Sequence, residues 1–366
     1  MSNLIALSFF TGAGGLDMGV ERAGFDIKLC LEIEEKYCRT LKENHPNWNV
    51  KHGDIMDYSK ERVYIESGLD QSQEIDLIIG GSPCQSFSTA GKRQAFDDPR
   101  GNAMLKYADL IEEIKPKVFV LENVKGLLSV ALKHRKISER GMEFPPLKEE
   151  ESRGSALKYL LNRFKSYNVK VEIVNAALYG VAQKRERVFI IGVKKDLNKE
   201  FVFPEPTHTK DGRDGTQKWI SVSNIFKELD VKIKKHDYVT YSPERLRFMK
   251  MIPKGGGDWR DLPDDIVKKA MGGAYNSAGG RVGFFRRIKI NEPAPTLLTS
   301  PMQKSTNLGH PFEDRPLSIQ EYLAIQGFPL NYKVSGNIND QYIQIGNAVP
   351  VHLAYVIGNA IYNLLK

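Results

Sequence analysis

Cysteine is scarce in this chain, with only three in 366 residues. So few cysteines argue against a disulfide framework and fit a reducing compartment. None stands at metal-ligand spacing with histidines, so we expect no metal site. No segment approaches the ~20 apolar residues that a membrane span needs. The apolar residues 1–10 lack a basic flank and precede glycines, which favours a first strand over a signal peptide.

An excess of acidic residues is also lacking. Lysine and arginine number 53 against 45 acidic residues, and the net charge is +8. That excess is modest for the length, but it permits a polyanionic partner, because cations displace counterions from phosphates. The length is sufficient for two domains and a large core.

Apolar strand-like runs and helical segments alternate along the first half of the chain, which predicts a parallel sheet. We expect strands at 4–10, 27–31, 75–79, 118–121, 169–174 and 188–193, and helices at 16–23, 34–44, 102–114 and 155–167. Residues 131–153 are densely charged and read as a solvated insertion. From about Lys194 glycine-rich pieces predict a second, looser domain of loops and short strands. Regular structure is expected again at 318–326 and 351–365.

A cysteine and a carboxylate follow two of these strands. Cys84 comes just after the strand at 75–79, and Glu122 ends the strand at 118–121. Adjacent strand ends of an open α/β sheet face the same crevice. A thiol and a carboxyl there could together add a nucleophile to a ring and protonate that ring. Most free cysteines are inert core, which we expect of Cys30 and Cys38, whereas small and polar neighbours surround Cys84.

A glycine-rich turn, residues 12–15, follows the first expected strand and would let a ligand approach the backbone closely. The dinucleotide fingerprint G-x-G-x-x-G fails at its last place, where Asp17 stands, which disfavours a plain nicotinamide site. Glu32 lies 20 residues after Gly12, where an acid binds ribose hydroxyls, and Asp54 follows at the next strand end. The pattern favours a nucleoside cofactor with little need for phosphate binding, such as S-adenosylmethionine.

Short blocks distributed over nearly the whole chain now define a resemblance. The chain resembles the cytosine-C5 DNA methyltransferases, in which such blocks occur in the same order. They are Phe9-Phe10-Thr11-Gly12-Ala13-Gly14-Gly15, Leu31-Glu32, Gly53-Asp54-Ile55, Gly80-Gly81-Ser82-Pro83-Cys84-Gln85-Ser86-Phe87-Ser88, Asp98-Pro99-Arg100-Gly101, Glu122-Asn123-Val124, Gln183-Lys184-Arg185-Glu186-Arg187, Pro293-Ala294-Pro295-Thr296-Leu297 and Gln344-Ile345-Gly346-Asn347-Ala348-Val349-Pro350.

The resemblance implies a Rossmann-like α/β methyltransferase sheet with a second, smaller target-recognition domain. Residues 1–193, completed by 335–366, would bind the cofactor and catalyse the reaction; residues 194–334 would form the target-recognition domain and hinge. Cys84 would add to C6 of cytosine so that C5 attacks a methyl sulfonium. Glu122 would contact N3 and the exocyclic amine, while Arg187, together with Arg185, would hold the base carbonyl and orient Glu122. A buried ion pair is the ordinary alternative for Glu122 and Arg187.

The cofactor implied is S-adenosylmethionine, with S-adenosylhomocysteine as the product. Phe10 would pack on the adenine, Glu32 would hold the ribose, and Asp54 would meet the adenine amine. The remaining residues expected at this site are Gly12, Gly14, Gly15, Leu16, Ile33, Ile55, Asn347 and Ala348. Phe10 and Ile55 have an ordinary alternative as core, and the two acids as solvated side chains.

The partner implied is double-stranded DNA, whose target base must leave the stack to reach Cys84. The residues expected to contact DNA from the loop 85–101 are Gln85, Ser88, Lys92, Arg93 and Arg100. Base readers are expected in 194–286, with Arg245, Arg247, Lys254, Arg260, Arg281 and Arg286 as candidates. The resemblance also implies a monomer in the bacterial cytoplasm, working beside a separate restriction endonuclease.

Three other functions are weighed against this one. A tRNA-modifying branch shares two of the blocks but carries a further Cys-Phe-Thr, and no cysteine follows Cys84 here. A catalytically silent DNA-binding regulator is disfavoured by the intact Cys84, Glu122, Arg187 and Glu32. An amino-group methyltransferase would show Pro-Pro-aromatic in place of Pro-Cys-Gln.

Overall fold

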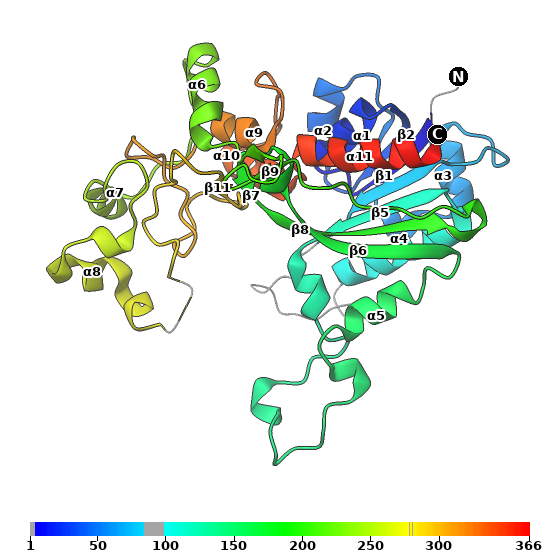
Figure 1. The fold of residues 1–366 in the computed structure, drawn as a ribbon, viewed down its shortest axis with the longest axis horizontal. Coiled ribbons are helices and arrows are strands. Elements are labelled where there is room, and N and C mark those ends of the chain that lie inside the picture. Colours follow the sequence, from blue (N-terminus) through cyan, green and yellow to red (C-terminus); the bar gives the residue numbers. More distant parts are fainter. Residues whose placement is uncertain (1–3, 84–98, 278, 280) are drawn as a thin grey trace. The chain divides into compact units, whose positions relative to one another are not determined.

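The computed structural model describes residues 4–83, 99–277, 279 and 281–366 (Figure 1). The predicted nucleophile Cys84 therefore lies outside the described residues, as do four of the predicted DNA contacts: Gln85, Ser88, Lys92 and Arg93. Arg100 lies in the first turn of helix α4, Pro99–Ile114, with its side chain outside the description.

A seven-stranded sheet forms the centre of the first part of the chain, in the order β3-β2-β1-β4-β5-β8-β6. Its strands are β1 Leu4–Phe9, β2 Phe25–Glu32, β3 Val50–His52, β4 Leu77–Gly81, β5 Val118–Asn123, β6 Tyr167–Asn175 and β8 Glu186–Lys194. The pairs from β3 to β5 are parallel, and β8 runs antiparallel to β5. The chain winds outward from β1 and then returns to β4, so the switch point, where α/β folds bind ligands, lies between these strands.

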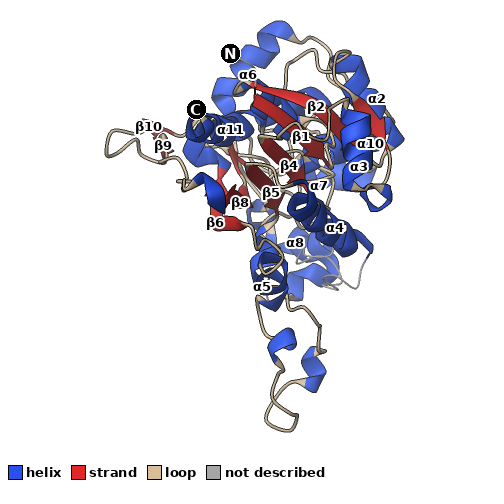
Figure 2. Cartoon of the chain, turned by 90° about the vertical axis from the view of Figure 1, so that its right-hand side faces the viewer, coloured by secondary structure: helices blue, strands red, loops and turns tan. Residues whose placement is uncertain are grey.

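Helices cover the sheet, as Figure 2 shows. They are α1 Gly15–Arg22, α2 Glu35–Asn44, α3 Lys60–Ser67, α4, α5 Ser155–Leu161 and α11 Val351–Leu365. Helix α1 packs so tightly on α11 that a Cβ added at Gly19 would lie 2.4 Å from the Cβ of Ala354. Helices α3, α4 and α5 share one core cluster with Leu7 and Phe119 of the sheet. The predicted Rossmann-like α/β architecture is therefore confirmed.

The predicted helix 155–167 is wrong at its end, because α5 stops at Leu161. The ring of Phe164 stacks on Phe119 at 4.3 Å, and Tyr167 meets the same ring edge-on at 4.9 Å. Tyr167 then begins β6. Burial of these two rings against the sheet outweighs the helical pattern of the sequence.

Residues 131–153 form a loop with short 3-10 turns that extends away from the sheet (Figure 2). Lys133 pairs with Glu150, and Arg135 pairs with Glu151 and donates to the carbonyl oxygen of Pro145. Most of the loop is exposed, as predicted for a solvated insertion.

The described residues form two compact units. Unit 1 consists of residues 1–174, 186–205 and 354–366, and unit 2 of residues 175–185 and 206–353. These boundaries differ from the predicted ones, since residues 335–353 pack in unit 2. There the hydroxyl of Tyr342 donates to Leu317, and the amide of Gln326 donates to Ile345. The roles of the two units in catalysis and recognition stay predictions.

Unit 2 is more helical than the glycine-rich sequence predicted. Its helices are α6 Val222–Lys232, α7 Pro243–Met249, α8 Asp264–Met271, α9 Ile319–Gln326 and α10 Ile338–Asn347, and its strands β7 Gln183–Lys184, β9 His208–Thr209, β10 Gln217–Lys218 and β11 Ala294–Pro295 are two residues each. The start of α7 has a local sequence signal. Ser242 caps the helix by accepting from the N–H of Arg245, and proline follows at the first helical position.

Within the described part of the chain, one helical stretch, 338–365, is apolar enough by length and composition to cross a bilayer, with half of its most apolar window buried. It consists of α10 and α11, which are separated at residues 348–350. Ile345, Ile357 and Ile361 are at most 1% exposed. We interpret the stretch as two core helices.

Candidate active site

The turn between β1 and α1 has an unusual backbone. Phe10, Gly12 and Gly14 all have positive φ, at 57°, 60° and 81°. That conformation costs energy for a phenylalanine, and such strain is typical of functional sites. A Cβ added at Gly12 would meet nothing nearer than the carbonyl oxygen of Phe10, at 3.9 Å. The turn therefore presents its backbone to open space, where a ligand can approach.

Glu32 ends β2 beside this turn and is 5% exposed. Its carboxylate accepts the N–H of Gly12 at 2.7 Å and the N–H of Glu34 at 2.9 Å. Burial raises the pKa of Glu32, whereas these hydrogen bonds lower it. A carboxylate has about four acceptor positions, so Glu32 can still accept from ribose hydroxyls. Its orientation is set by the same turn that would hold the cofactor.

The other predicted cofactor residues of unit 1 differ in how far their side chains are exposed to solvent. Ile33 is 54% exposed directly after Glu32, as an apolar wall for an adenine requires. Asp54 accepts the N–H of Met56 at 3.0 Å and caps the 3-10 turn Ile55–Asp57. Leu16 and Ile55 are buried like core residues. Ile33 and Asp54 therefore fit a nucleoside cofactor, whereas Leu16 and Ile55 fit the core.

Three predicted cofactor residues complete the set: Gly15, Asn347 and Ala348. Gly15 is the first residue of α1. Asn347 ends α10, and Ala348 follows it, so both belong to unit 2. Their contribution to the cofactor pocket stays a prediction.

Asp17, which the sequence analysis used only to exclude a nicotinamide fingerprint, lies in the first turn of α1. It is 1% exposed, and its Oδ1 lies 3.9 Å from the Sγ of Cys30. Burial raises the pKa of Asp17 to about 7, although a hydrogen bond from Ser8 lowers it. Cys30 and Cys38 are both buried, as predicted for core cysteines.

Glu122 and Arg187 form an ion pair at the ends of β5 and β8. The Nε of Arg187 lies 3.0 Å from Oε1 of Glu122, and the two side chains are 14% and 8% exposed. Gly81 pairs with Glu122 across the strands, and a Cβ there would lie 3.2 Å from Oε2 of Glu122. Glycine leaves room for the carboxylate, and the arginine orients it.

Asn123 follows Glu122 at the end of β5 and links this strand end to Ser82, two residues before Cys84. Its amide donates to the carbonyl oxygen of Ser82 at 3.2 Å and to the Ser82 hydroxyl at 3.0 Å. Its own oxygen accepts the N–H of Val124 at 2.8 Å. Asn123 is 1% exposed. The sequence reasoning gave it no role, although an amide directly after Glu122 was a visible signal.

Arg185, which was predicted to act together with Arg187, lies in a different environment. It is fully buried in unit 2, and its guanidinium donates to the carbonyl oxygens of Leu297 at 3.0 Å and Asn347 at 3.2 Å. These contacts favour a structural role for Arg185 and leave Arg187 as the partner of Glu122. Among the described residues, no group of three or more His, Cys, Asp or Glu could hold a metal ion.

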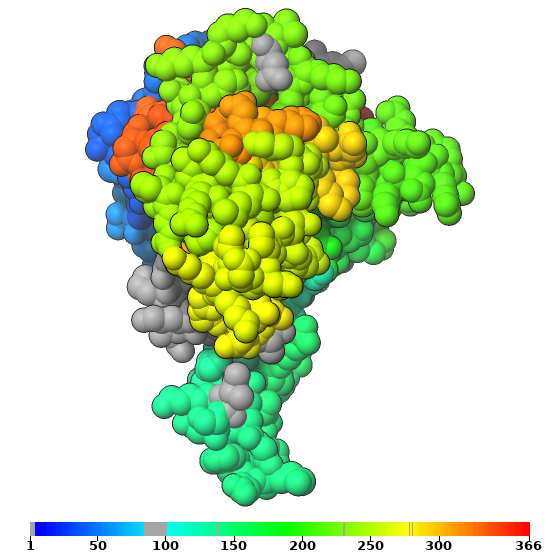
Figure 3. Space-filling view, turned by 90° about the vertical axis from the view of Figure 1, so that its left-hand side faces the viewer, coloured from blue at the N-terminus to red at the C-terminus, as the bar shows by residue number. Residues whose placement is uncertain are grey.

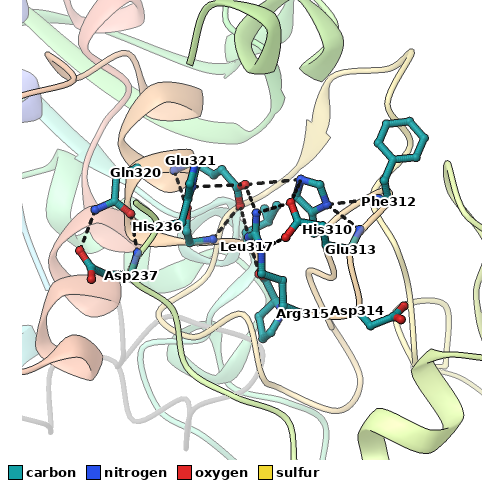
Figure 4. Close-up of polar contacts among 12 residues, drawn as sticks. His236, Asp237, His310, Phe312, Glu313, Asp314, Arg315, Leu317, Gln320 and Glu321 are labelled. Carbon is teal, nitrogen blue, oxygen red and sulfur yellow. Dashed lines mark hydrogen bonds and ion pairs between the residues drawn. The ribbon is translucent and has the colours of Figure 1, made fainter. Parts of the chain in front are cut away.

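A buried polar network joins helix α9 to the segment before it (Figure 4). Glu321 is 1% exposed and binds the guanidinium of Arg315 at 2.8 and 3.0 Å. His310 accepts the N–H groups of Phe312 and Glu313 at Nδ1, and its Nε2 lies 3.5 Å from Glu321. The network fixes the segment 310–318 to α9.

The six cations predicted as base readers are not equivalent. Five are held by partners within unit 2: Arg245, Lys254, Arg260, Arg281 and Arg286. Arg245, for example, donates to the carbonyl oxygen of Met302 and to Asn307. Arg247 is exposed, and no contact of its guanidinium is found within the described part of the chain. Among the six predicted base readers, Arg247 is therefore the one whose guanidinium N–H groups could donate to a base edge.

The doubly wound sheet, its glycine turn and the acid at the end of β2 together define a Rossmann-like methyltransferase. The model of the C-5 cytosine-specific DNA methylase family matches residues 4–363. The chain therefore belongs to this family and is a sequence-specific DNA (cytosine-5-)-methyltransferase, as predicted.

Named relatives agree with this assignment. The chain is 39% identical to the Type II methyltransferase M.Sau96I of Staphylococcus aureus, over 98% of this chain and 75% of that protein. It is 38% identical to M.PspPI of a Psychrobacter species, over 98% and 79%. The solved structure of the Entamoeba histolytica methyltransferase EhMeth, 15% identical, matches with a TM-score of 0.60 over 100% of both chains and shares the fold.

Proposed function

We propose that this chain methylates C5 of a cytosine everted from duplex DNA, with Cys84 as the nucleophile and Glu122 as the acid. The observation that carries the proposal is the Glu122–Arg187 ion pair, at the strand end beside Gly81. Asn123 ties that strand end to Ser82, two residues before Cys84. A buried, oriented carboxylate tied to the residues that precede a cysteine in the chain is the arrangement this chemistry needs.

The reaction follows from the residue types. The thiolate of Cys84 adds to C6 of cytosine while Glu122, in its protonated form, hydrogen-bonds N3 and stabilises the adduct. S-Adenosylmethionine, when bound, supplies an electrophilic methyl group to the enamine carbon C5. Loss of the C5 proton then expels the Cys84 thiolate and restores the aromatic ring. A thiol with a pKa near ~8.5 is mostly protonated at neutral pH, so the complete site must favour its ionisation.

The cofactor would be held by the residues around the glycine turn. Glu32 would accept from the ribose hydroxyls, Ile33 and Phe10 would flank the adenine, and Asp54 would accept from its amine. The open space beside Gly12 supports this assignment. S-Adenosylhomocysteine would be released as the product.

The substrate would be double-stranded DNA, and unit 2 would read its sequence. We further propose that the enzyme works as a monomer in the bacterial cytoplasm, as the modification partner of a separate restriction endonuclease. The names of the Type II relatives support this last point.

The test uses radiolabelled S-adenosylmethionine with duplex DNA and with tRNA. We expect label on DNA alone, and bisulfite sequencing then gives the recognition site. Cys84→Ala should abolish transfer while the cofactor still binds. Cys38→Ser is the matched control, because Cys38 is buried and its sulfur donates to the carbonyl oxygens of Glu32 and Lys51.

A duplex with 5-fluorocytosine at the target position should trap a covalent complex with the wild-type protein. Label on tRNA instead of DNA would refute the proposed substrate. Full activity of Cys84→Ala, or methylation without any trapped adduct, would refute the proposed nucleophile.

A further inference from the structure

A cavity of about 530 Å³ lies in unit 2, between α7, α8 and the segments that follow them. Figure 3 shows the face of the unit on which these two helices lie, in yellow-green and yellow. Protein interiors are close-packed, and a space of this volume is typical of a ligand site. The cavity is therefore a candidate binding site within unit 2.

The inner surface of the cavity is aromatic and thioether in character. Phe248, Phe284 and Phe285 line it and are 6–8% exposed, and Met271 is 4% exposed. Phe248 and Phe285 meet edge-to-face at 5.6 Å, which holds their rings in place. Such surfaces bind the π-face of a planar ring.

The rim of the cavity carries lysines whose ammonium groups could bind an anionic ligand. Lys269 and Lys304 line the cavity and are exposed, and no ion pair of either is found within the residues described. Glu244 is the one carboxylate among the lining residues, and the exposed Arg247 lies one turn further along α7. The rim is therefore positive on balance.

A second cavity of about 290 Å³ provides a contrast. Lys254 and Lys289 line it, but they pair with Asp314 and Glu292. Its cations are neutralised within the protein, so it lacks the free charge that an anionic ligand would need.

We propose that the larger cavity receives a nucleobase of the DNA substrate other than the target cytosine. This base would be unstacked from the duplex and would lie against the rings of the cavity. Lys269 and Lys304 would bind the flanking phosphates. The inference rests on the proposed DNA substrate and goes beyond it, because the target cytosine would bind at Glu122.

The direct test is NMR of the full chain labelled with ¹³C at its methionine methyl groups, titrated with the cognate duplex. Met271 and Met302 line the cavity, whereas Met104 is fully buried in unit 1 and serves as the internal reference. A base stacked in the cavity should shift both lining signals upfield by its ring current, with Met104 unchanged. 2-Aminopurine placed at single positions of the duplex should brighten at one position besides the target.

A second test is the salt dependence of duplex binding. The double variant Lys269→Gln/Lys304→Gln should lower the slope of log Kd against log salt concentration by about 2, since each phosphate contact contributes about 0.9. The matched control Lys254→Gln/Lys289→Gln should change it less, because both lysines already have carboxylate partners.

Unshifted Met271 and Met302 signals with a duplex that the enzyme methylates would overturn the inference and leave the proposed function intact. Equal shifts with free deoxynucleotide monophosphates would also overturn it, since the ligand would then be a free nucleotide. Failure of the wild type to methylate any DNA would instead refute the proposed function itself.

Discussion

Asp17 lies in the first turn of α1 with 1% of its surface exposed. Burial raises its pKa to about 7, from an ordinary value of 3.8, and the charges of Glu32 and Glu21 add to the effect. A hydrogen bond from Ser8 opposes the shift. Cys30 faces Asp17 across a sulfur–oxygen distance of 3.9 Å and supplies no positive charge. The folded protein therefore favours the neutral acid, whereas the unfolded chain ionises it near pH 4.

The sign of the effect on stability follows from this difference. Between pH 4 and pH 7 the folded state binds one proton more than the unfolded state at this residue, so Asp17 lowers the free energy of unfolding as pH rises. Above pH 7 Asp17 is ionised in both the folded and the unfolded state, so its effect on the free energy of unfolding no longer changes with pH. Between pH 5 and the folded-state pKa of about 7 lie about two pH units, and each lowers the free energy of unfolding by about 1.4 kcal/mol. From pH 5 to pH 8 the free energy of unfolding therefore falls by about 3 kcal/mol.

The variant Asp17→Asn keeps the shape and removes the titration. Relative to wild type, its free energy of unfolding should rise by about 3 kcal/mol between pH 5 and pH 8. Urea unfolding followed by the fluorescence of Trp48 measures this for unit 1, after Trp219 and Trp259 are replaced by phenylalanine. Asp57→Asn, at an exposed acid, is the matched control. A difference between Asp17→Asn and wild type that does not change with pH would refute the reasoning.

Three further predictions concern the active site. Asn123→Ala loses its hydrogen bonds to Ser82, so single-turnover methylation should slow by about tenfold or more, at about 1 kcal/mol per bond, while the cofactor Kd from calorimetry stays unchanged. Glu32→Gln should weaken S-adenosylmethionine binding about 10- to 100-fold in the same calorimetry, because charged hydrogen bonds are lost; an unchanged Kd would exclude Glu32 from the cofactor site. Gly81→Ala crowds the Glu122 carboxylate at 3.2 Å and should lower kcat with little change in thermal unfolding; a normal kcat would contradict this geometry.

The amino-acid sequence by itself identified the features that depend on residues adjacent to one another in the chain. The glycine turn, the acid at the end of the second strand and the alternation of strands and helices are local patterns, and each lies where it was predicted. The ordered blocks identified the family, because such blocks depend on chemistry that few side chains can perform. Helix α11 was predicted with its observed bounds, since its long apolar pattern has no competing signal.

Tertiary structure decided which of two similar side chains serves which role. Arg185 and Arg187 stand two residues apart, yet one binds carbonyl oxygens of unit 2 and the other pairs with Glu122. The antiparallel register of β8 on β5 sets this difference, by bringing together residues more than 60 positions apart in the chain. The buried state of Asp17 and the placement of residues 335–353 in unit 2 have the same origin. Each depends on packing between distant segments, and no local pattern of residues records that packing.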